Sequence, residues 1–196
     1  MSMWELAAVV LAIAYVLLAV YERIECWYAA FFSTLIYIFL FWNVSLVMES
    51  LLNAYYLIMA LYGWTQWRGK VYEHRDVRIQ LWSLQKHVIA IAIILSLTLI
   101  TGTLLGKNTN AALPYLDSFT TWAAVVTTYM VTQKVLENWI YWLVINPLSI
   151  YLFLDRGMVL TALLYVVYII MSLVGLYTWV LRYRKQSKAW PPATSV

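Results

Sequence analysis

Charged residues are scarce in this sequence: Asp, Glu, Lys and Arg make up 11% of its 196 residues, whereas 64% are hydrophobic. A soluble domain is about a quarter charged and about half apolar, so this composition excludes an ordinary soluble fold. The alternation of apolar and polar residues that marks β-barrel strands is also absent. Helices are then the only structures that satisfy the backbone in lipid.

Residues that carry soluble-enzyme chemistry are equally sparse. Cys26 is the only cysteine, so no intrachain disulfide can form, and His74 and His87 are the only histidines. The sequence contains no G-x-G-x-x-G, P-loop or H-E-x-x-H motif. We therefore expect no cofactor, no metal and no nucleic-acid partner, since the net charge of +4 follows the membrane boundaries.

The charges divide the chain into seven apolar stretches. Each has about the length that a tilted helix needs to cross roughly 30 Å of hydrocarbon. We expect the first to be a membrane span and not a signal peptide, because it lacks a basic flank and a cleavage site. The predicted spans are Leu6–Tyr21, Cys26–Met48, Ser50–Trp67, Val88–Leu105, Ser118–Gln133, Asn138–Leu154 and Gly157–Leu181.

The distribution of Lys and Arg predicts the orientation in a bacterial inner membrane. Eleven of the 13 basic residues fall on one side, and only Lys107 and Arg156 fall on the other. Basic loops stay in the cytoplasm, so we expect an outside N-terminus and a cytoplasmic C-terminus. The spacing of Val77, Leu81 and Leu84 predicts a short interfacial helix in the main cytoplasmic loop.

The chain also repeats itself at an offset of 112 residues. This shift superimposes five pairs without a gap: Glu25 on Glu137, Trp27 on Trp139, Tyr56 on Tyr168, Gly63 on Gly175, and Trp67 on Trp179. The shift covers four spans, an even number, so both repeats point the same way through the membrane. Parallel repeats are typical of transporters whose substrate site lies between them, near mid-membrane.

The repeat predicts an all-α integral membrane protein with seven transmembrane helices, arranged as two parallel three-helix bundles joined by a linker helix. The predicted divisions are a first bundle at 1–67, a cytoplasmic loop at 68–87, a linker helix at 88–106, a second bundle at 107–181 and a cytoplasmic tail at 182–196.

Polar residues inside the spans are the candidate substrate contacts. Asn138, Trp142 and Asn146 follow at intervals of four and share one helical face. The third and seventh spans carry matched faces, and Trp139 is also a candidate substrate contact. The matched faces consist of Glu49, Asn53 and Tyr56 on one span and Thr161, Tyr165 and Tyr168 on the other.

Two other roles compete with substrate binding. Polar side chains also hold membrane helices together, at about 1 kcal/mol each. Tyr and Trp near span ends are usually interfacial anchors, which we expect for Trp4, Trp64, Trp67, Trp82, Trp179 and Tyr183. Glu25 and Glu137 lie at the cytoplasmic ends of their spans, where a helix-start or gating role fits better than ligand contact. No span carries a central Asp or Arg of the kind that proton relays use, so passive movement is the simpler expectation.

Several segments resemble one transporter family. The run KVLENWIYWLVINPLSIYL, the run NAYYLIMALYGWTQW (Asn53–Trp67) and the run PYLDSFTTW (Pro114–Trp122) are similar to signature regions of PnuC-type vitamin transporters. The resemblance implies a SWEET-like arrangement of two bundles, facilitated diffusion of an unphosphorylated B vitamin, trapping by a cytoplasmic kinase, and a homotrimer.

The resemblance leaves the substrate open among family substrates. Members that carry nicotinamide riboside commonly have Gln where this chain has Asn53, and the sequence as a whole looks closest to the thiamine branch (PnuT). Thiamine and nicotinamide riboside are both aromatic cations that an indole can hold by cation–π attraction. Thiamine is the first expectation and nicotinamide riboside the alternative. A lipid-modifying membrane enzyme or a non-transporting sensor subunit would be a different class of protein.

The orientation is directly testable. A reporter fused after Val196 should be active only in the cytoplasm, and a tag before Met1 should be accessible from outside intact cells, because basic loops resist translocation. A C-terminus that external protease removes would contradict this topology.

Overall fold

Seven helices make up the regular structure of the described residues. The computed structural model describes residues 3–43, 47–72, 78–108, 113–155 and 159–189. The seven-helix prediction is confirmed. The helices are α1 (Met3–Val20), α2 (Cys26–Asn43), α3 (Val47–Tyr72), α4 (Leu84–Asn108), α5 (Pro114–Thr132), α6 (Asn138–Asp155) and α7 (Val159–Ala189).

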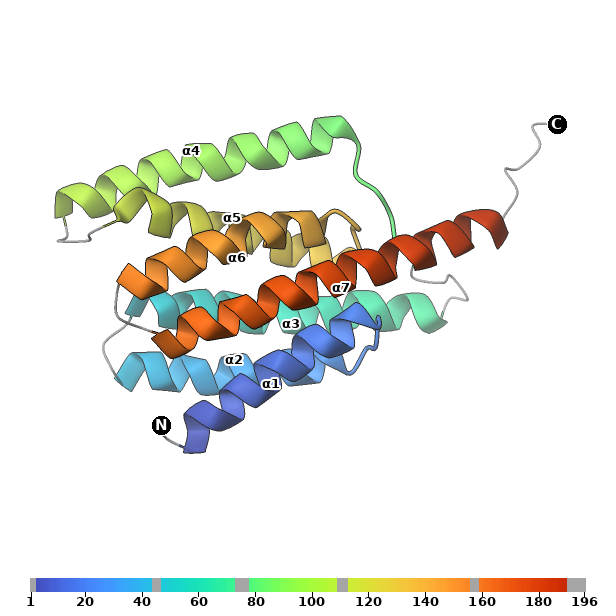
Figure 1. The fold of residues 1–196 in the computed structure, drawn as a ribbon, viewed down its shortest axis with the longest axis horizontal. Coiled ribbons are helices and arrows are strands. Elements are labelled where there is room, and N and C mark those ends of the chain that lie inside the picture. The colour runs from blue at the N-terminus through green and yellow to red at the C-terminus, as the bar shows by residue number, and fades with distance from the viewer. Residues whose placement is uncertain (1–2, 44–46, 73–77, 109–112, 156–158, 190–196) are drawn as a thin grey trace.

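The contacts between six of these helices close into a ring. Figure 1 views these helices from the side. Helices α1, α2 and α3 pack in chain order, and so do α5, α6 and α7. The two sets meet where α3 packs on α5 and where α7 packs on α1. These two contacts are equivalent under the 112-residue repeat, so a half-turn about the ring axis exchanges the sets. Within the described residues, helices on opposite sides of the ring do not pack against each other.

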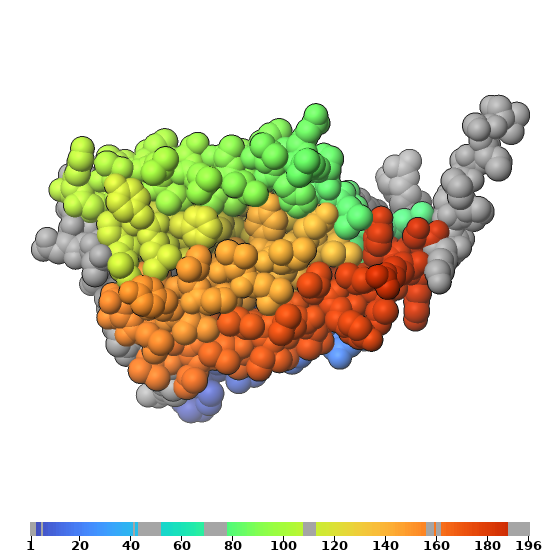
Figure 2. Space-filling view, turned by 45° about the horizontal axis from the view of Figure 1, so that its top comes forward, coloured from blue at the N-terminus to red at the C-terminus, as the bar shows by residue number. Residues whose placement is uncertain are grey.

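The seventh helix, α4, lies outside the ring and packs on α5 (Figure 2). An 18-residue stretch within Leu84–Lys107 has a mean hydropathy of 2.6, yet only 22% of that stretch is buried. Large aliphatic side chains such as Ile89, Ile93 and Ile100 are exposed along it. A helix that is apolar on its exposed face belongs in lipid, which fits the linker helix that the sequence predicts.

A tryptophan–glycine contact repeats in both sets. A Cβ on Gly63 would lie 2.4 Å from the Trp27 ring, and one on Gly175 would lie 2.7 Å from the Trp139 ring. Trp27 meets Trp67 edge to face, with ring centroids 5.3 Å apart. The matched pair, Trp139 with Trp179, has a centroid distance of 5.4 Å. Three of the five residue pairs that revealed the repeat in the sequence therefore form the same packing contact in both sets.

Trp67 and Trp179 also join the two sets to each other. The last carbonyls of a helix have no intrahelical donor. Trp67 Nε1 donates to the carbonyl of Thr132, the last residue of α5, at 3.2 Å. Trp179 Nε1 donates to the carbonyl of Val20, the last residue of α1, at 3.1 Å. Both indoles are at most 2% exposed, so their assignment as interfacial anchors is wrong: each satisfies a helix end of the opposite repeat.

The interfacial helix predicted between α3 and α4 is not formed by the described part of that segment. Residues 78–83, which we name the strap, are extended and lie against the turn between α5 and α6. Gln80 N donates to the Lys134 carbonyl at 3.0 Å, and Leu136 N donates to the Gln80 carbonyl at 2.9 Å. Backbone pairing with this turn overrides the helical spacing of its apolar residues. Val77 lies outside the described residues.

The tryptophan–glycine contact predicts that replacing this helical glycine by alanine destabilises the protein, although the same change usually stabilises a helix. Gly63→Ala should lower the free energy of unfolding by about 1–3 kcal/mol, because the added methyl overlaps the Trp27 ring. Gly106→Ala is the matched control, since its nearest neighbour would be Pro114 Cγ at 3.4 Å. Alanine normally stabilises a helix relative to glycine, so the control should be neutral or slightly stabilising. Thermal unfolding of the purified variants measures both, and equal melting temperatures would contradict the packing argument.

Candidate functional site

The polar stripe of α6 is largely buried. Asn138 and Asn146 are 0% and 1% exposed, and Trp142, between them, is half-buried. Trp142 packs against the apolar residues around Val20 and Trp179 and also against those around Ile145. Pro147 follows directly in the helix and lacks an N–H, so the carbonyl one turn earlier is left without its helical partner. The middle of α6 is thus rich in hydrogen-bonding capacity for a membrane helix.

Both asparagine side chains keep one atom without a partner. Asn146 Nδ2 donates to Ser172 Oγ at 3.3 Å, and Ser172 Oγ in turn donates to the Tyr168 carbonyl at 2.7 Å. Asn138 Nδ2 donates to the Val135 carbonyl at 2.6 Å. The Oδ1 atoms of both are buried and accept no hydrogen bond from the protein. A buried acceptor without a donor costs about 1–3 kcal/mol, so each is a place where a ligand N–H or O–H would be stabilised.

A tyrosine group lies between α1, α2 and α7. Tyr165 and Tyr168 of α7 touch, with ring centroids 5.5 Å apart. Tyr168 interacts electrostatically with Tyr37 of α2 and Tyr15 of α1. Helices α2 and α7 do not pack on each other, and the Tyr168 side chain is partly accessible.

Sequence reasoning missed Tyr15 and Tyr37. The 112-residue shift held a signal for Tyr37, because it pairs this residue with Ser149, another buried polar position. The same shift pairs Tyr15 with Thr127, which is also a buried polar position. In the structure, Tyr15 contacts Trp27 at a centroid distance of 6.0 Å.

The α3 side of the ring contributes Asn53 and Tyr56. Asn53 is 8% exposed, and Tyr56 is half-buried beside Tyr55. Tyr55 donates to the Val125 carbonyl of α5 at 2.9 Å and so ties the two repeats together at mid-helix. The side chains of Glu49 and Thr161, the remaining members of the matched faces, lie outside the described residues.

The structure assigns the predicted gating residues to two different environments. Arg23 donates to Glu25 at 2.8 Å within the same turn, and this hydrogen bond lowers the pKa of the exposed Glu25 carboxyl to about 2. Glu137 instead accepts from Trp82 N of the strap at 3.2 Å and lies 3.5 Å from His87 Nε2. The repeat therefore conserves the glutamate but not its partner.

Trp139, the last of the predicted site residues, is 3% exposed and lies in the tryptophan–glycine contact of α6 and α7. Its Nε1, like the equivalent atom of Trp27, has no partner in the protein. Its part in substrate binding stays a prediction.

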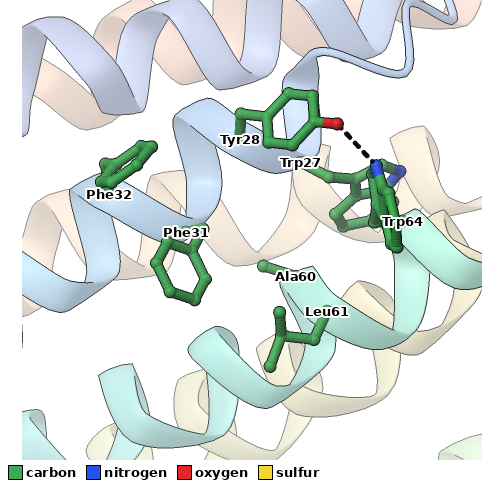
Figure 3. Close-up of a pocket in the computed structure, with 7 residues that line it drawn as sticks. All are labelled: Trp27, Tyr28, Phe31, Phe32, Ala60, Leu61 and Trp64. Atoms are coloured by element: carbon green, nitrogen blue, oxygen red, sulfur yellow. Dashed lines mark hydrogen bonds between the residues drawn. The ribbon is translucent and has the colours of Figure 1, made fainter.

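A pocket of about 290 Å³ lies elsewhere, between α2 and α3 (Figure 3). Tyr28, Phe32 and Leu61 on its walls are about half exposed, so the pocket opens on the outer surface of the ring. Its polar contact is the hydrogen bond from Trp64 Nε1 to Tyr28 Oη, at 3.0 Å. This apolar groove suits a lipid chain better than a polar solute. The full lining is Trp27, Tyr28, Phe31, Phe32, Ala60, Leu61 and Trp64.

Known proteins share this fold and sequence pattern. Residues 2–181 match the protein family described as nicotinamide mononucleotide transporter. The chain is 21% identical over 188 residues to the nicotinamide riboside transporter PnuC of Escherichia coli (strain K12), covering 83% of this chain and 79% of that protein. It is 27% identical over 146 residues to the riboflavin/roseoflavin transporter RibM of Streptomyces davaonensis, covering 69% and 65% of the two chains.

A solved structure described as the vitamin B3 transporter PnuC has the same fold. It superimposes with a TM-score of 0.76 over 94% of this chain and 83% of the other, at 22% sequence identity. The family match extends over nearly the whole chain, including both repeats and the linker helix. The chain therefore belongs to the nicotinamide mononucleotide transporter family and is a multi-pass membrane transporter, not an enzyme.

Proposed function

We propose that this protein carries an unphosphorylated B vitamin across the membrane by facilitated diffusion, and that nicotinamide riboside is its main substrate. The observation that carries the proposal is the chemistry of the ring helices, which carry the buried amides of Asn53 and Asn146 and the half-buried aromatic side chains of Trp142 and Tyr168. Relatives of this chain are named for nicotinamide riboside and for riboflavin, which favours nicotinamide riboside over our first expectation, thiamine.

The site residues fit a cationic aromatic ring joined to a polar sugar. An indole face holds a cation by its quadrupole, and the unpaired Oδ1 of Asn146 can accept from a ribose hydroxyl or an amide N–H. A phosphate group would need Arg, Lys or a helix N-terminus to hold its charge. The spans carry no Lys or Arg at mid-depth, so the site suits the nucleoside better than the nucleotide.

Transport without an ion gradient follows from the same composition. No span has a central acidic or basic residue to couple solute movement to protons. In this proposal, net uptake into the cell depends on phosphorylation of the vitamin by a cytoplasmic kinase. The protein lies in a bacterial inner membrane with its C-terminus in the cytoplasm, and a homotrimer is the assembly that the family resemblance implies.

Thiamine is the second candidate, because Asn53 replaces the Gln that nicotinamide riboside transporters commonly carry. An Asn amide offers a donor and an acceptor to an aminopyrimidine edge. Asn53 is buried on α3, one turn from Tyr56, where such pairing is possible.

Uptake into proteoliposomes tests the function. Labelled nicotinamide riboside should equilibrate without overshoot, and collapsing a proton or sodium gradient should leave the initial rate unchanged. Excess unlabelled nicotinamide riboside should compete most strongly, thiamine less, and nicotinamide mononucleotide least. Stronger competition by thiamine would establish the second candidate in place of the first. Uphill accumulation driven by either gradient would refute uniport.

Removal of the central indole tests the site. Trp142→Ala should weaken binding about five- to thirtyfold, since a desolvated cation–π contact is worth about 1–2 kcal/mol. Trp142→Phe should lose less. Trp64→Ala is the matched control, because Trp64 lies on the outward groove and bonds Tyr28. Calorimetry on the purified variants measures the difference. Wild-type affinity in Trp142→Ala together with a loss in Trp64→Ala would place the substrate outside the ring.

A further inference from the structure

The turns that follow α1 and α5 have the same unusual backbone. Each closes with the two hydrogen bonds of a Schellman motif. The 6→1 bond of the motif joins Arg23 N to the Leu18 carbonyl at 2.9 Å in the first turn. In the second turn it joins Val135 N to the Met130 carbonyl at 2.9 Å. The left-handed position of this motif is normally glycine. Here it is Glu22, with φ 55°, and Lys134, with φ 51°. A left-handed conformation costs a non-glycine residue about 1–2 kcal/mol, and strain of this kind gathers at functional sites.

Glu22 and Lys134 are equivalent residues of the two repeats, separated by the offset of 112. They also contact each other: Lys134 Nζ lies 2.7 Å from Glu22 Oε2. A residue can touch its own equivalent only where the axis passes between them. The left-handed turns therefore aim two opposite charges at each other across the axis of the ring.

Arg182 of α7 completes this group, which we name the axial ion cluster (Glu22, Lys134 and Arg182). Its Nη1 donates to Glu22 Oε1 at 2.9 Å and to the Tyr21 carbonyl at 2.8 Å. The side chains of Glu22 and Lys134 are only 9% and 8% exposed. Lys134 Nζ also lies 4.4 Å from the centroid of Trp67. Both cations come from the second repeat and the carboxylate comes from the first.

The cluster lies at one end of the ring, where α1 and α5 finish (Figure 1). The two cross-repeat tryptophan bonds, to Val20 and Thr132, lie directly beside it. The Glu22–Lys134 pair and both indoles are buried, so this end of the ring is closed in this structure, whereas the Arg182 side chain beside them is 38% exposed. In a transporter of two repeats, one repeat rocks against the other to open each end in turn. Any opening here must separate Glu22 from both of its cations.

We propose that the axial ion cluster is the gate at this end of the transport path: its ion pairs hold the end closed, and breaking them opens it to the cytoplasm. The role rests on the proposed transport function. The cluster differs from Glu25, which bonds Arg23 in its own turn, and from Glu137, which accepts from Trp82 N of the strap. The axial ion cluster joins charges of opposite repeats. Removing one partner of a buried ion pair strongly destabilises the structure that buries the other, because it leaves an uncompensated charge. The closed state therefore depends on each member.

Cys26 provides a natural reporter of opening. This single cysteine is 0% exposed and packs with Trp67 and Val131 in the apolar cluster that spans both repeats, next to the gate. A maleimide can reach it only when the repeats separate at this end. Its rate of labelling in the folded, purified protein measures the open fraction without any introduced cysteine.

The experiment compares labelling rates in single variants. Lys134→Gln and Glu22→Gln should label at least about tenfold faster than wild type. Loss of a buried ionic partner should shift the equilibrium from the closed to the open state by at least a factor of about ten. Glu22→Gln should exceed Lys134→Gln, which keeps the Arg182 pair. Lys134→Arg, which restores the cation, should label close to wild type.

Arg23→Gln is the matched control. It removes a cation from the same turn, but its partner Glu25 belongs to the same repeat and both are exposed. The control should label like wild type. Equal rates in all variants, or a rise in Arg23→Gln as large as that in Lys134→Gln, would overturn the proposal. Circular dichroism must show full helix content, and if Glu22→Gln does not fold, Lys134→Gln and Lys134→Arg still decide. Labelling needs no substrate, so failure of the transport assay alone would refute the proposed function and not the closure.

Discussion

Hydrogen bonding across the repeat boundary is the constraint on which the rest of the structure depends. In lipid, an indole N–H and the last carbonyls of a helix both lack water as a partner. Trp67 and Trp179 satisfy helix ends of the opposite repeat, at Thr132 and Val20. This exchange fixes the ring at one end, and the glycines under Trp27 and Trp139 allow the helices of each repeat to approach closely enough for it. The asparagines and tyrosines that we propose as substrate contacts lie on helices of this ring.

The sequence predicts most of this architecture because the residues that coincide in the two repeats include tryptophans and glycines, whose coincidence is easy to recognise. Trp27, Gly63 and Trp67 coincide with Trp139, Gly175 and Trp179, and the three residues of each repeat pack together in the same way. The role of Trp67 was misread, since a tryptophan near a span end is usually at the interface. Nothing in a single sequence shows that its N–H faces a helix end from the other half of the chain.

The polar interior could be predicted only in part. The spacing of Asn138, Trp142 and Asn146 gives a shared face, but not which amide atom is left without a donor; that depends on Ser172 of the next helix. The pairing of Glu22 with Lys134 escaped prediction for another reason. The two residues have opposite charge, so a search for identical residues at the repeat offset passes over them, although complementary charges are what an axis position requires.

The proposed transport mechanism requires that the two repeats move against each other about an axis between Glu22 and Lys134, with the solute bound inside the ring. Hydrogen exchange measured with and without saturating nicotinamide riboside tests this most directly. The account predicts that the substrate changes exchange in residues 21–25 and 133–137 in the same direction and by comparable factors, although the strap makes the second turn slower to exchange at the outset. A change confined to one turn, or equal exchange in both states alongside measured binding, would contradict it.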